Sequence, residues 1–432
     1  MTLQSARSSH RRPLLLCLIV AAAAAAHPAG AQQPDSVRAA HDSLVARLER
    51  AEAAIEMLRQ QVAAQDESSV KAKSGMKLEW HGRILMNAFS NSRRTNNSDV
   101  PTTARADTAN GLDQGGAGIE IRQTTLGLAV TAPKVLGAEF LGDLDLDFFG
   151  GQVATSGGRT MPVLRLRTAR AILTWTHVQV LFGQEEPLVS NLNPVSLAGI
   201  GAPDFSAAGN LWYWIPQARL TVFTGGPTKI GLTGAILAPM TGDAVGAFDT
   251  DFDVAERSRR PNFEGRAFVR WGEGESEGEI GLGAHLGWFA PARDSLLESR
   301  GVMADALVPM GKFVEFRGEA FAGRGLRGLG GGQIAQLFGK NGVVVRGTGG
   351  WGQLNIRPST RVTFGAGYGF DDPNDADLTA SGRLKNVTSE THLIVRPGGP
   401  LVFSAEWRRT TTTFTARSWT NDHFNLGAGF EF

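Results

Sequence analysis

Apolar and polar residues alternate along the last ten residues of the chain, HFNLGAGFEF. Every second residue from Phe424 to Phe432 is apolar, and the residues between them are Asn, Gly or Glu. Successive side chains of a β-strand point to opposite faces, so this period of two predicts a strand with one apolar face. The same period recurs from Met76 onward, in runs separated by clusters of Gly, Pro, Asn and Asp.

These runs predict about sixteen strands and an all-β fold. No apolar run long enough for a membrane-spanning helix occurs beyond the extreme amino terminus. The predicted strands lie near 76–89, 117–131, 137–149, 161–175, 177–184, 209–223, 228–238, 262–272, 279–290, 300–309, 312–323, 342–357, 360–370, 383–396, 400–411 and 422–432.

The connections between the predicted strands alternate between long and short. Long polar segments, of which TTFTARSWTN is the last, follow every second strand, and turns such as TH, GGPT and PGG follow the others. Long loops on one rim and tight turns on the other indicate an antiparallel transmembrane β-barrel of even strand number. A closed barrel has no free edge, so we expect the last strand, ending at Phe432, to pair with the first.

Before the strands, residues 35–66 favour a helix, because this segment has no Gly and no Pro. Apolar residues repeat every seven positions in two registers, one through Leu48 and Ile55 and the other through Leu44 and Leu58. We therefore predict a periplasmic coiled-coil helix that joins copies of the chain, followed by a linker at 67–75 and the barrel at 76–432. The alternative is a single amphipathic helix that lies on its own protein. The pattern does not set the number of associating chains.

The first 31 residues have the order of an export signal: three arginines, an apolar stretch and an Ala-x-Ala cleavage site at Ala29 to Ala31. A short membrane anchor is the alternative. Cys17 does not fit a lipoprotein site, because Leu16 precedes it where a small residue is required. Removal of residues 1–31 takes three of 43 basic residues and none of the 42 acidic ones, which leaves a formal charge of −2 and no cysteine. A disulfide framework is therefore excluded.

Alternation also predicts which side chains face the barrel interior. In the predicted strand GAEFLGDLDLDFFG the acids share one parity, and in its neighbour PVLRLRTA the residues Arg165 and Arg167 alternate with Leu164 and Leu166. Both charged sets are expected to face inward and to pair across the two strands. The inward acids of this ladder are Asp143, Asp145 and Asp147.

Arginines occur at inward positions of several other predicted strands. Guanidinium is always charged and matches carboxylate or phosphate groups, so an arginine-lined pore would favour anions. The alternative is a solvated wall whose salt bridges hold the barrel in shape, with nearby acids that cancel the field. The predicted pore-lining residues are Arg83, Arg122, Asp143, Asp145, Asp147, Arg165, Arg167, Arg219, Arg266, Arg270, Arg317 and Arg408.

The long connection at 185–208 is apolar enough, in PLVSNLNPVSLAGIG, to pack against the inside of the wall. We predict that it folds inward and narrows the pore, with Glu185, Glu186 and Asp204 near the narrowest point. An outward surface loop is the alternative.

Three stretches resemble the DcaP-like trimeric porins of Gram-negative outer membranes: EIRQTTLGLAV at 120–130, GDLDLDFFGG at 142–151, and LFGQEEP at 181–187 with LWYWIPQARL downstream. The order of export signal, helix, linker and barrel is also similar to that family. The resemblance implies an outer-membrane homotrimer, inserted by the barrel-assembly machinery through a carboxyl-terminal signal at Phe432. It also implies a passive pore for small anionic solutes such as dicarboxylates. Phosphate-selective porins are similar in architecture and remain an alternative.

Two other classes of function are possible for such a barrel. An outer-membrane enzyme needs a nucleophile beside a base, and none of the eight His lies next to an evident nucleophile motif. A structural tether to other envelope layers needs reach, whereas a helix of about 30 residues spans only about 45 Å. No cofactor motif, metal-ligand spacing or nucleic-acid patch stands out, so we expect a channel without an enzymatic activity or cofactor.

Overall fold

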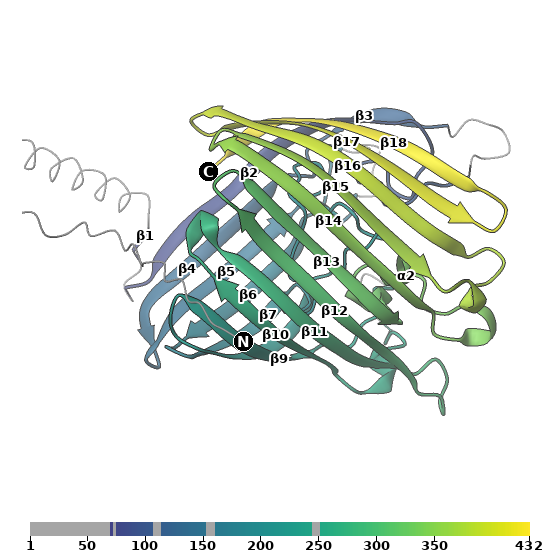
Figure 1. Ribbon diagram of the computed structural model, residues 1–432, viewed down its shortest axis with the longest axis horizontal. Coiled ribbons are helices and arrows are strands. Elements are labelled where there is room, and N and C mark those ends of the chain that lie inside the picture. Colours follow the sequence, from purple (N-terminus) through teal and green to yellow (C-terminus); the bar gives the residue numbers. More distant parts are fainter. Residues whose placement is uncertain (1–69, 72–74, 107–113, 153–159, 244–250) are drawn as a thin grey trace, which may run out of the picture. The chain divides into compact units, whose positions relative to one another are not determined.

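Antiparallel strands close into a single barrel in the computed structural model of the protein (Figure 1). The structure describes residues 70–71, 75–106, 114–152, 160–243 and 251–432; the predicted signal and coiled-coil helix lie outside these residues. The strands are β1 (Val70–Lys71), β2 (Lys77–Asn91), β3 (Gly116–Glu120), β4 (Thr125–Val135), β5 (Ala138–Asp147), β6 (Arg165–Thr174), β7 (Val178–Glu185), β8 (Ile215–Phe223), β9 (Thr228–Leu237), β10 (Asn262–Trp271), β11 (Gly278–Phe289), β12 (Leu297–Met310), β13 (Val314–Arg324), β14 (Arg346–Ser359), β15 (Val362–Pro373), β16 (Arg383–Gly398), β17 (Leu401–Phe414) and β18 (Ser418–Glu431).

Sixteen of these segments make the wall, once the two-residue β1 is set aside and β3 and β4 are counted as one interrupted strand. The last strand, β18, pairs with the first wall strand, β2, with Phe430 opposite Ile84. Gly82 and Phe432 exchange two backbone hydrogen bonds of 3.0 Å. The wall therefore has no free edge, which confirms the predicted closed barrel of about sixteen strands.

Among the described residues, short helical turns lie only in the connections between strands. They are η2 (Glu256–Ser258), η3 (Gly274–Ser276), η4 (Leu326–Leu329), α2 (Gly332–Ala335), η5 (Lys340–Gly342) and η6 (Asp375–Asp377). No helix among the described residues is long and apolar enough to cross a membrane.

The strand predicted at 117–131 is interrupted at residues 121–124, so β3 and β4 pair with separate parts of β2. At the interruption Gln123 is fully buried: its side chain accepts hydrogen bonds from the backbone of Ile200 and Gly201 and donates one to Ala198. The wall strand breaks here because this side chain binds a segment on the inside of the barrel.

The predicted alternation of long and short connections is present over most of the barrel. It is weak on either side of β11, where residues 272–277 and 290–296 form connections of six and seven residues, and it is lost at the last connection. Residues 412–421 were expected to form a long loop, yet β17 continues to Phe414 and β18 begins at Ser418. The hydroxyl groups of Thr411 and Thr420 lie 2.9 Å apart, as do those of Thr413 and Ser418. Threonine favours the strand conformation and these cross-strand pairs extend the ladder, so the expected loop becomes a tight turn.

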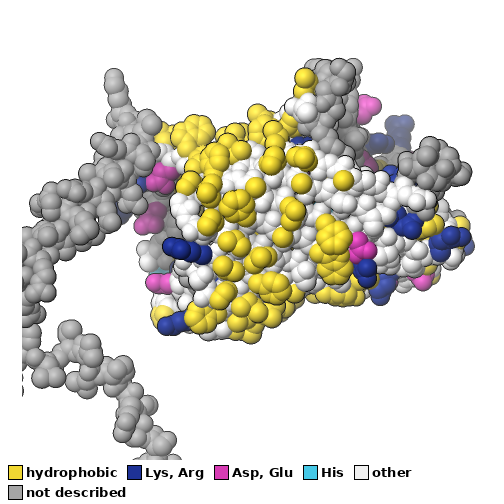
Figure 2. Space-filling view, turned by 90° about the horizontal axis from the view of Figure 1, so that it is seen from above, with side chains coloured by type: hydrophobic (Ala, Val, Ile, Leu, Met, Phe, Trp, Pro, Cys, Tyr) yellow, Lys and Arg dark blue, Asp and Glu magenta, His cyan; other side chains and the backbone are white. Residues whose placement is uncertain are grey.

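The outer face of the wall is apolar and the inner face is polar. On β11, Leu282 is 66% exposed, whereas the neighbouring inward residues Glu279 and His285 are only 6% and 4% exposed. Figure 2 shows hydrophobic side chains spread over one face of the wall, with charged side chains toward both of its ends. Apolar groups outside and charged groups inside are the inverse of a water-soluble protein, as expected for strands that face lipid.

Candidate functional site

The connection between β7 and β8, residues 186–214, runs inside the barrel. It binds polar side chains that point inward from wall strands far apart in the sequence. Its partners are Asn87 on β2, Gln123 beside β4, Glu264 on β10, Glu319 on β13, Gln353 on β14, Asn386 on β16 and Glu406 on β17. We call residues 186–214 the inner loop.

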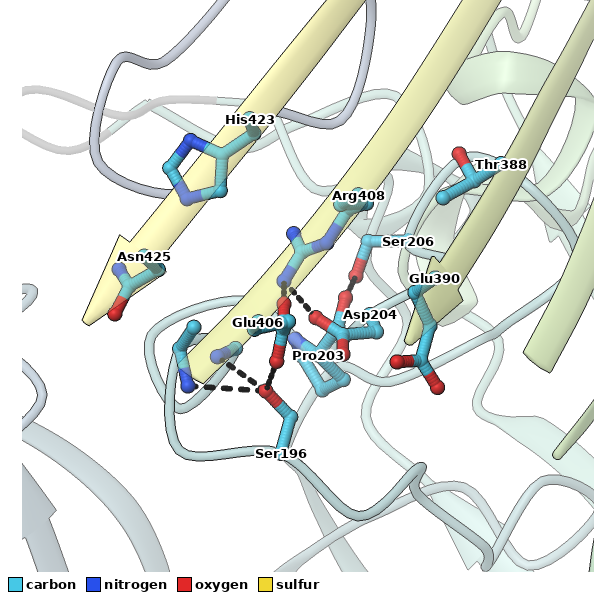
Figure 3. A network of polar contacts seen from close by, with 12 residues as sticks. Ser196, Pro203, Asp204, Ser206, Thr388, Glu390, Glu406, Arg408, His423 and Asn425 are labelled. Atoms are coloured by element: carbon cyan, nitrogen blue, oxygen red, sulfur yellow. Dashed lines mark hydrogen bonds and ion pairs between the residues drawn. The ribbon is translucent and has the colours of Figure 1, made fainter. Parts of the chain in front are cut away.

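An ion-pair cluster holds the inner loop to the wall at Ser196 and Asp204 (Figure 3). Arg408 on β17 is 2% exposed; its guanidinium pairs with Asp204 of the loop and donates a hydrogen bond of 2.5 Å to Glu406. The hydroxyl of Ser196 donates to the other oxygen of Glu406, also at 2.5 Å. Burial raises the pKa of Asp204 while the charge of Arg408 opposes the shift.

Carboxylates of Asp204, Glu390 and Glu406 lie within 4.8 Å of one another, a separation that metal ligands also show. All three are buried, and the guanidinium of Arg408 lies against two of them. The positive charge that three close carboxylates require is thus supplied, at least in part, by an arginine of the wall.

Further anchors lie along the middle of the inner loop. Glu319 accepts hydrogen bonds from the Ser190 hydroxyl at 2.5 Å and from the Leu192 backbone at 2.8 Å. The side chain of Gln353 both accepts from and donates to the backbone of Val195, at 2.7 and 3.0 Å. These bonds satisfy the backbone groups of the loop as a neighbouring strand would, which lets an irregular segment lie inside a barrel.

One side of the inner loop is packed closely against the wall, although a smaller cavity of about 190 Å³ lies between the loop and strands β6 to β10. Leu188, Val189 and Leu211 of the loop join a buried apolar cluster with residues of β9, β12, β13 and η4. On the same side, Arg266 of β10 is 4% exposed and binds both Asp305, at 2.5 and 2.9 Å, and Glu279, at 2.5 Å. We call this region, between the inner loop and strands β9 to β13, the packed side.

On the other side, a polar cavity of about 530 Å³ lies between the inner loop and the wall. Wall residues from β2, β4, β5, β6, β7 and β18 face loop residues between Asn193 and Pro203. We call this region the open side. Its ionisable residues are His81, Arg83, Asp145, Arg167, Arg170, Glu185, Glu186 and Glu431.

The predicted ladder of acidic and basic residues on β5 and β6 is present with a different register. Asp147 lies opposite Arg165, with hydrogen bonds of 2.6 and 3.0 Å. The pairing then shifts by one residue, so that Arg167 is the extra residue of a bulge and Asp143 lies opposite Arg170. The prediction therefore missed Arg170, because a period of two cannot locate a bulge.

Arg167 has looser contacts than the other arginines of this ladder. Its nearest carboxylate oxygen, on Asp147, is 3.9 Å away, and its guanidinium lies over the ring of Trp214 at 4.9 Å. Arg165 also lies over Trp214 and contacts the ring of Phe149. Arg122 lies over the same Phe149 ring at 4.1 Å. Arginines and aromatic rings thus alternate along this part of the wall.

The remaining predicted residues fall into different environments. Arg83 lines the open side, 3.9 Å from Glu431. Arg317 and Arg219 bind the inner loop at the backbone oxygens of Asn193 and Glu186. Arg270 pairs with Glu279 and Glu277, and Glu185 pairs with Arg170.

Glu186 is an ionisable residue of the inner loop that lines the open side. Burial raises the pKa of Glu186 above its ordinary 4.5, while the charge of Arg167 and a hydrogen bond from Asn193 act in the opposite direction. This carboxyl therefore takes up a proton at a higher pH than an exposed glutamate does.

Solved structures of outer-membrane channels share this fold. The outer membrane channel DcaP of Acinetobacter baumannii matches with a TM-score of 0.65 and 18% sequence identity over 84% of this chain and 100% of that chain. An anion-selective porin from Comamonas acidovorans matches at 0.52, with 12% identity over 83% and 100% of the chains. OmpF of Salmonella typhi, in complex with daunomycin, matches at 0.51, with 9% identity over 84% and 100%.

No protein-family model matches the chain, and no curated protein matches it in sequence. The identities to the solved structures are low, so the likeness establishes the porin fold and nothing finer. The resemblance to the DcaP-like fold that the sequence motifs indicated is confirmed at this level.

Proposed function

We propose that the chain is a bacterial outer-membrane porin, a passive diffusion channel for small hydrophilic solutes. Its closed barrel has the fold of the outer membrane channel DcaP, and its outer face is apolar where lipid would contact it. The observation that carries the proposal is the polar cavity between the inner loop and the wall, lined by charges that face water rather than lipid. No step of bond making or breaking is needed for this function.

In this proposal the inner loop is the constriction. Glu185 at the end of β7 and Glu186 at the start of the loop border the cavity. Asp204 binds the later part of the loop to Arg408. Pore width then depends on the anchors that hold the loop, because these bonds set how far it stands from β2 and β4 to β6.

A mild preference for anions such as dicarboxylates is supported by how the charges of the open side pair. Asp147, Asp143 and Glu185 each have an arginine at hydrogen-bonding distance. Arg167 has no carboxylate closer than 3.9 Å among the described residues. Its charge is thus the least neutralised of the β6 arginines, and a guanidinium is suited to bind a carboxylate of a passing solute.

The partners that complete this proposal are lipid, further copies of the chain and the assembly machinery. The heptads at 35–66 support association of chains through periplasmic helices, and the resemblance of the sequence motifs to trimeric porins supports a homotrimer. Phe432 is 51% exposed at the end of the closing strand, which leaves its ring available to the barrel-assembly machinery.

A planar bilayer with a salt gradient tests the proposal. Purified mature protein should give conductance steps in groups of three and a reversal potential displaced toward the anion equilibrium value. If the reversal potential is displaced much further in a gradient of phosphate than in a gradient of succinate, a phosphate-selective pore would be favoured instead. Absence of conductance from protein that migrates as a folded barrel would refute the channel and favour a structural tether.

A further inference from the structure

Three arginines stand side by side on the outer face of the wall, at the end where the long connections are. Arg300 on β12 is opposite Arg324 on β13, and Arg324 is opposite Arg346 on β14. Each has the parity of outward residues of its strand, such as Val302, which is 62% exposed, and Leu354 on β14. The three guanidinium groups therefore project from the outside of the barrel, away from the lumen.

Like charges directly opposite one another on neighbouring strands are destabilising unless a counter-charge lies between them. Nearby acidic side chains supply only part of this counter-charge. Glu298 is shared, at 2.6 Å from Arg324 and 3.9 Å from Arg300, while Asp377 binds Arg346 at 2.7 and 2.8 Å. Arg300 is thus without a close ion pair in the described residues, and Nε of Arg324 has no hydrogen-bond partner there.

The three arginines line a surface groove of about 720 Å³ that extends to the end of β15. Thr348, on the outer face of β14, adds a hydroxyl group. Two acids, Asp372 and Asp375, lie at the far edge, and Asp372 is paired with Lys385 at 2.9 Å. The arginine end of the groove is therefore a site for an anion with several oxygen acceptors.

Next to the arginine row, toward the short turns, the outer face of the same strands is apolar and made of small residues. On the outer face of β12, Val302 is followed by Ala304 and Ala306. On β13, Ala322 lies opposite Val302 and Ala320 lies opposite Ala304. The groove thus lies at the boundary between a charged rim and a smooth apolar band, the depth at which lipid headgroups meet acyl chains.

We propose that this groove binds the phosphate groups of an anionic lipid of the outer leaflet, a phosphorylated glycolipid of the lipid A type. The arginine forks bind the phosphates, since guanidinium matches phosphate oxygens in pairs, and the acyl chains lie along the apolar band. The inference rests on the proposed function only for the orientation of the barrel, with the long connections at the outer surface.

Lipid A binding to the full chain in a neutral detergent tests the site, with native mass spectrometry as the readout. Replacing Arg300, Arg324 and Arg346 together by Gln should weaken binding on the order of 100-fold, since each basic residue contributes about fivefold to attraction of an anionic lipid. Arg300→Gln alone should weaken it about fivefold. This single variant removes no close ion pair, so it keeps the test valid if the triple variant does not fold.

The matched control removes three positive charges from the opposite rim: Lys134→Gln, Lys312→Gln and Arg361→Gln together. These residues are exposed beside the short turns, and their loss should leave lipid A binding unchanged. Equal loss in both triple variants, or no loss in either, would overturn the proposal.

Two further arms define the ligand. Lipid A without its phosphates should bind at least tenfold more weakly, and inorganic phosphate at the concentration of lipid A should not displace it. Binding that survives phosphate removal, or full displacement by inorganic phosphate, would contradict a lipid site. Conductance of the same preparations separates the two proposals, because a conducting barrel without lipid A binding refutes only this one, and the reverse result refutes only the channel.

Discussion

The two sides of the inner loop use the same residue types for different purposes. On the packed side, Arg266 is held by Asp305 and Glu279 and is 4% exposed. On the open side, the side chain of Arg167 is 22% exposed and borders the cavity, and no carboxylate of the described residues lies closer to it than 3.9 Å. An inward arginine is therefore part of the scaffold where close carboxylates hold it, and part of the proposed pore where it borders the larger cavity without a close carboxylate.

The difference arises from where the loop finds its apolar partners. Leu188, Val189 and Leu211 pack into the cluster with β9, β12 and β13, and removal of apolar surface from water stabilises that contact. The loop therefore lies closer to one side of the barrel, and the larger cavity remains on the other side. Polar anchors at Glu319 and Arg408 then fix its path.

The largest effect is expected when the loop is released. Arg408→Met should destabilise the barrel by about 3–5 kcal/mol, because Asp204 and Glu406 would be left buried without their counter-charge. It should also raise single-channel conductance and its noise as the loop detaches. Urea unfolding in detergent and bilayer recording measure the two effects.

Arg409→Met is the matched control, because Arg409 is the next residue of β17 but faces outward and forms an exposed pair with Asp422. Water screens such an exposed pair, so its loss should barely change the stability. If both variants unfold and conduct alike, the anchor does not hold the loop.

A second variant separates scaffold from pore on the packed side. Arg266→Met leaves Asp305 and Glu279 without their shared partner, so we expect a loss of about 3 kcal/mol in unfolding free energy. The reversal potential should remain close to that of the wild type. Arg266 borders only the smaller cavity, and two carboxylates neutralise its charge there. A clear change in ion selectivity with unchanged stability would reverse the assignment of the two sides.

On the open side we expect a change in ion selectivity with little change in stability. Arg167→Gln should lower the anion-to-cation permeability ratio about sevenfold. One charge about 7 Å away in water changes the energy of an anion and of a cation by about 0.6 kcal/mol each, in opposite directions. The midpoint of urea unfolding should barely move. Arg165→Gln serves as the comparison variant, because its pair with Asp147 at 2.6 Å makes a loss of stability the expected result.

The smallest expected effect is a dependence of selectivity on pH. The pKa of Glu186 is raised by burial, so as the pH falls this carboxyl becomes neutral before exposed glutamates do, and the anion preference should increase. Because the pKa is raised in the folded state, ionisation of Glu186 lowers the free energy of unfolding. This cost is absent below the pKa of the unfolded state, and it develops as the pH rises through the pKa of the folded state. Glu186→Gln should remove this part of the reversal-potential profile, and an unchanged profile would exclude Glu186 as its source.

The sequence by itself determined the wall. A period of two is a local property of each strand, so it predicted the number of strands, the apolar outer face and the closure of β18 on β2. It also placed Arg165, Asp143 and Asp147 on the inward face, because parity needs no knowledge of neighbouring strands.

Only the tertiary structure decided which inward charges meet. A bulge at Arg167 shifted the partner of Asp143 to Arg170, and the ion pair of Asp204 with Arg408 joins residues 204 positions apart. The outer row of Arg300, Arg324 and Arg346 likewise depends on the register of two hairpins. Register and loop path are set by packing and hydrogen bonds between distant segments, and these contacts leave no period in the chain.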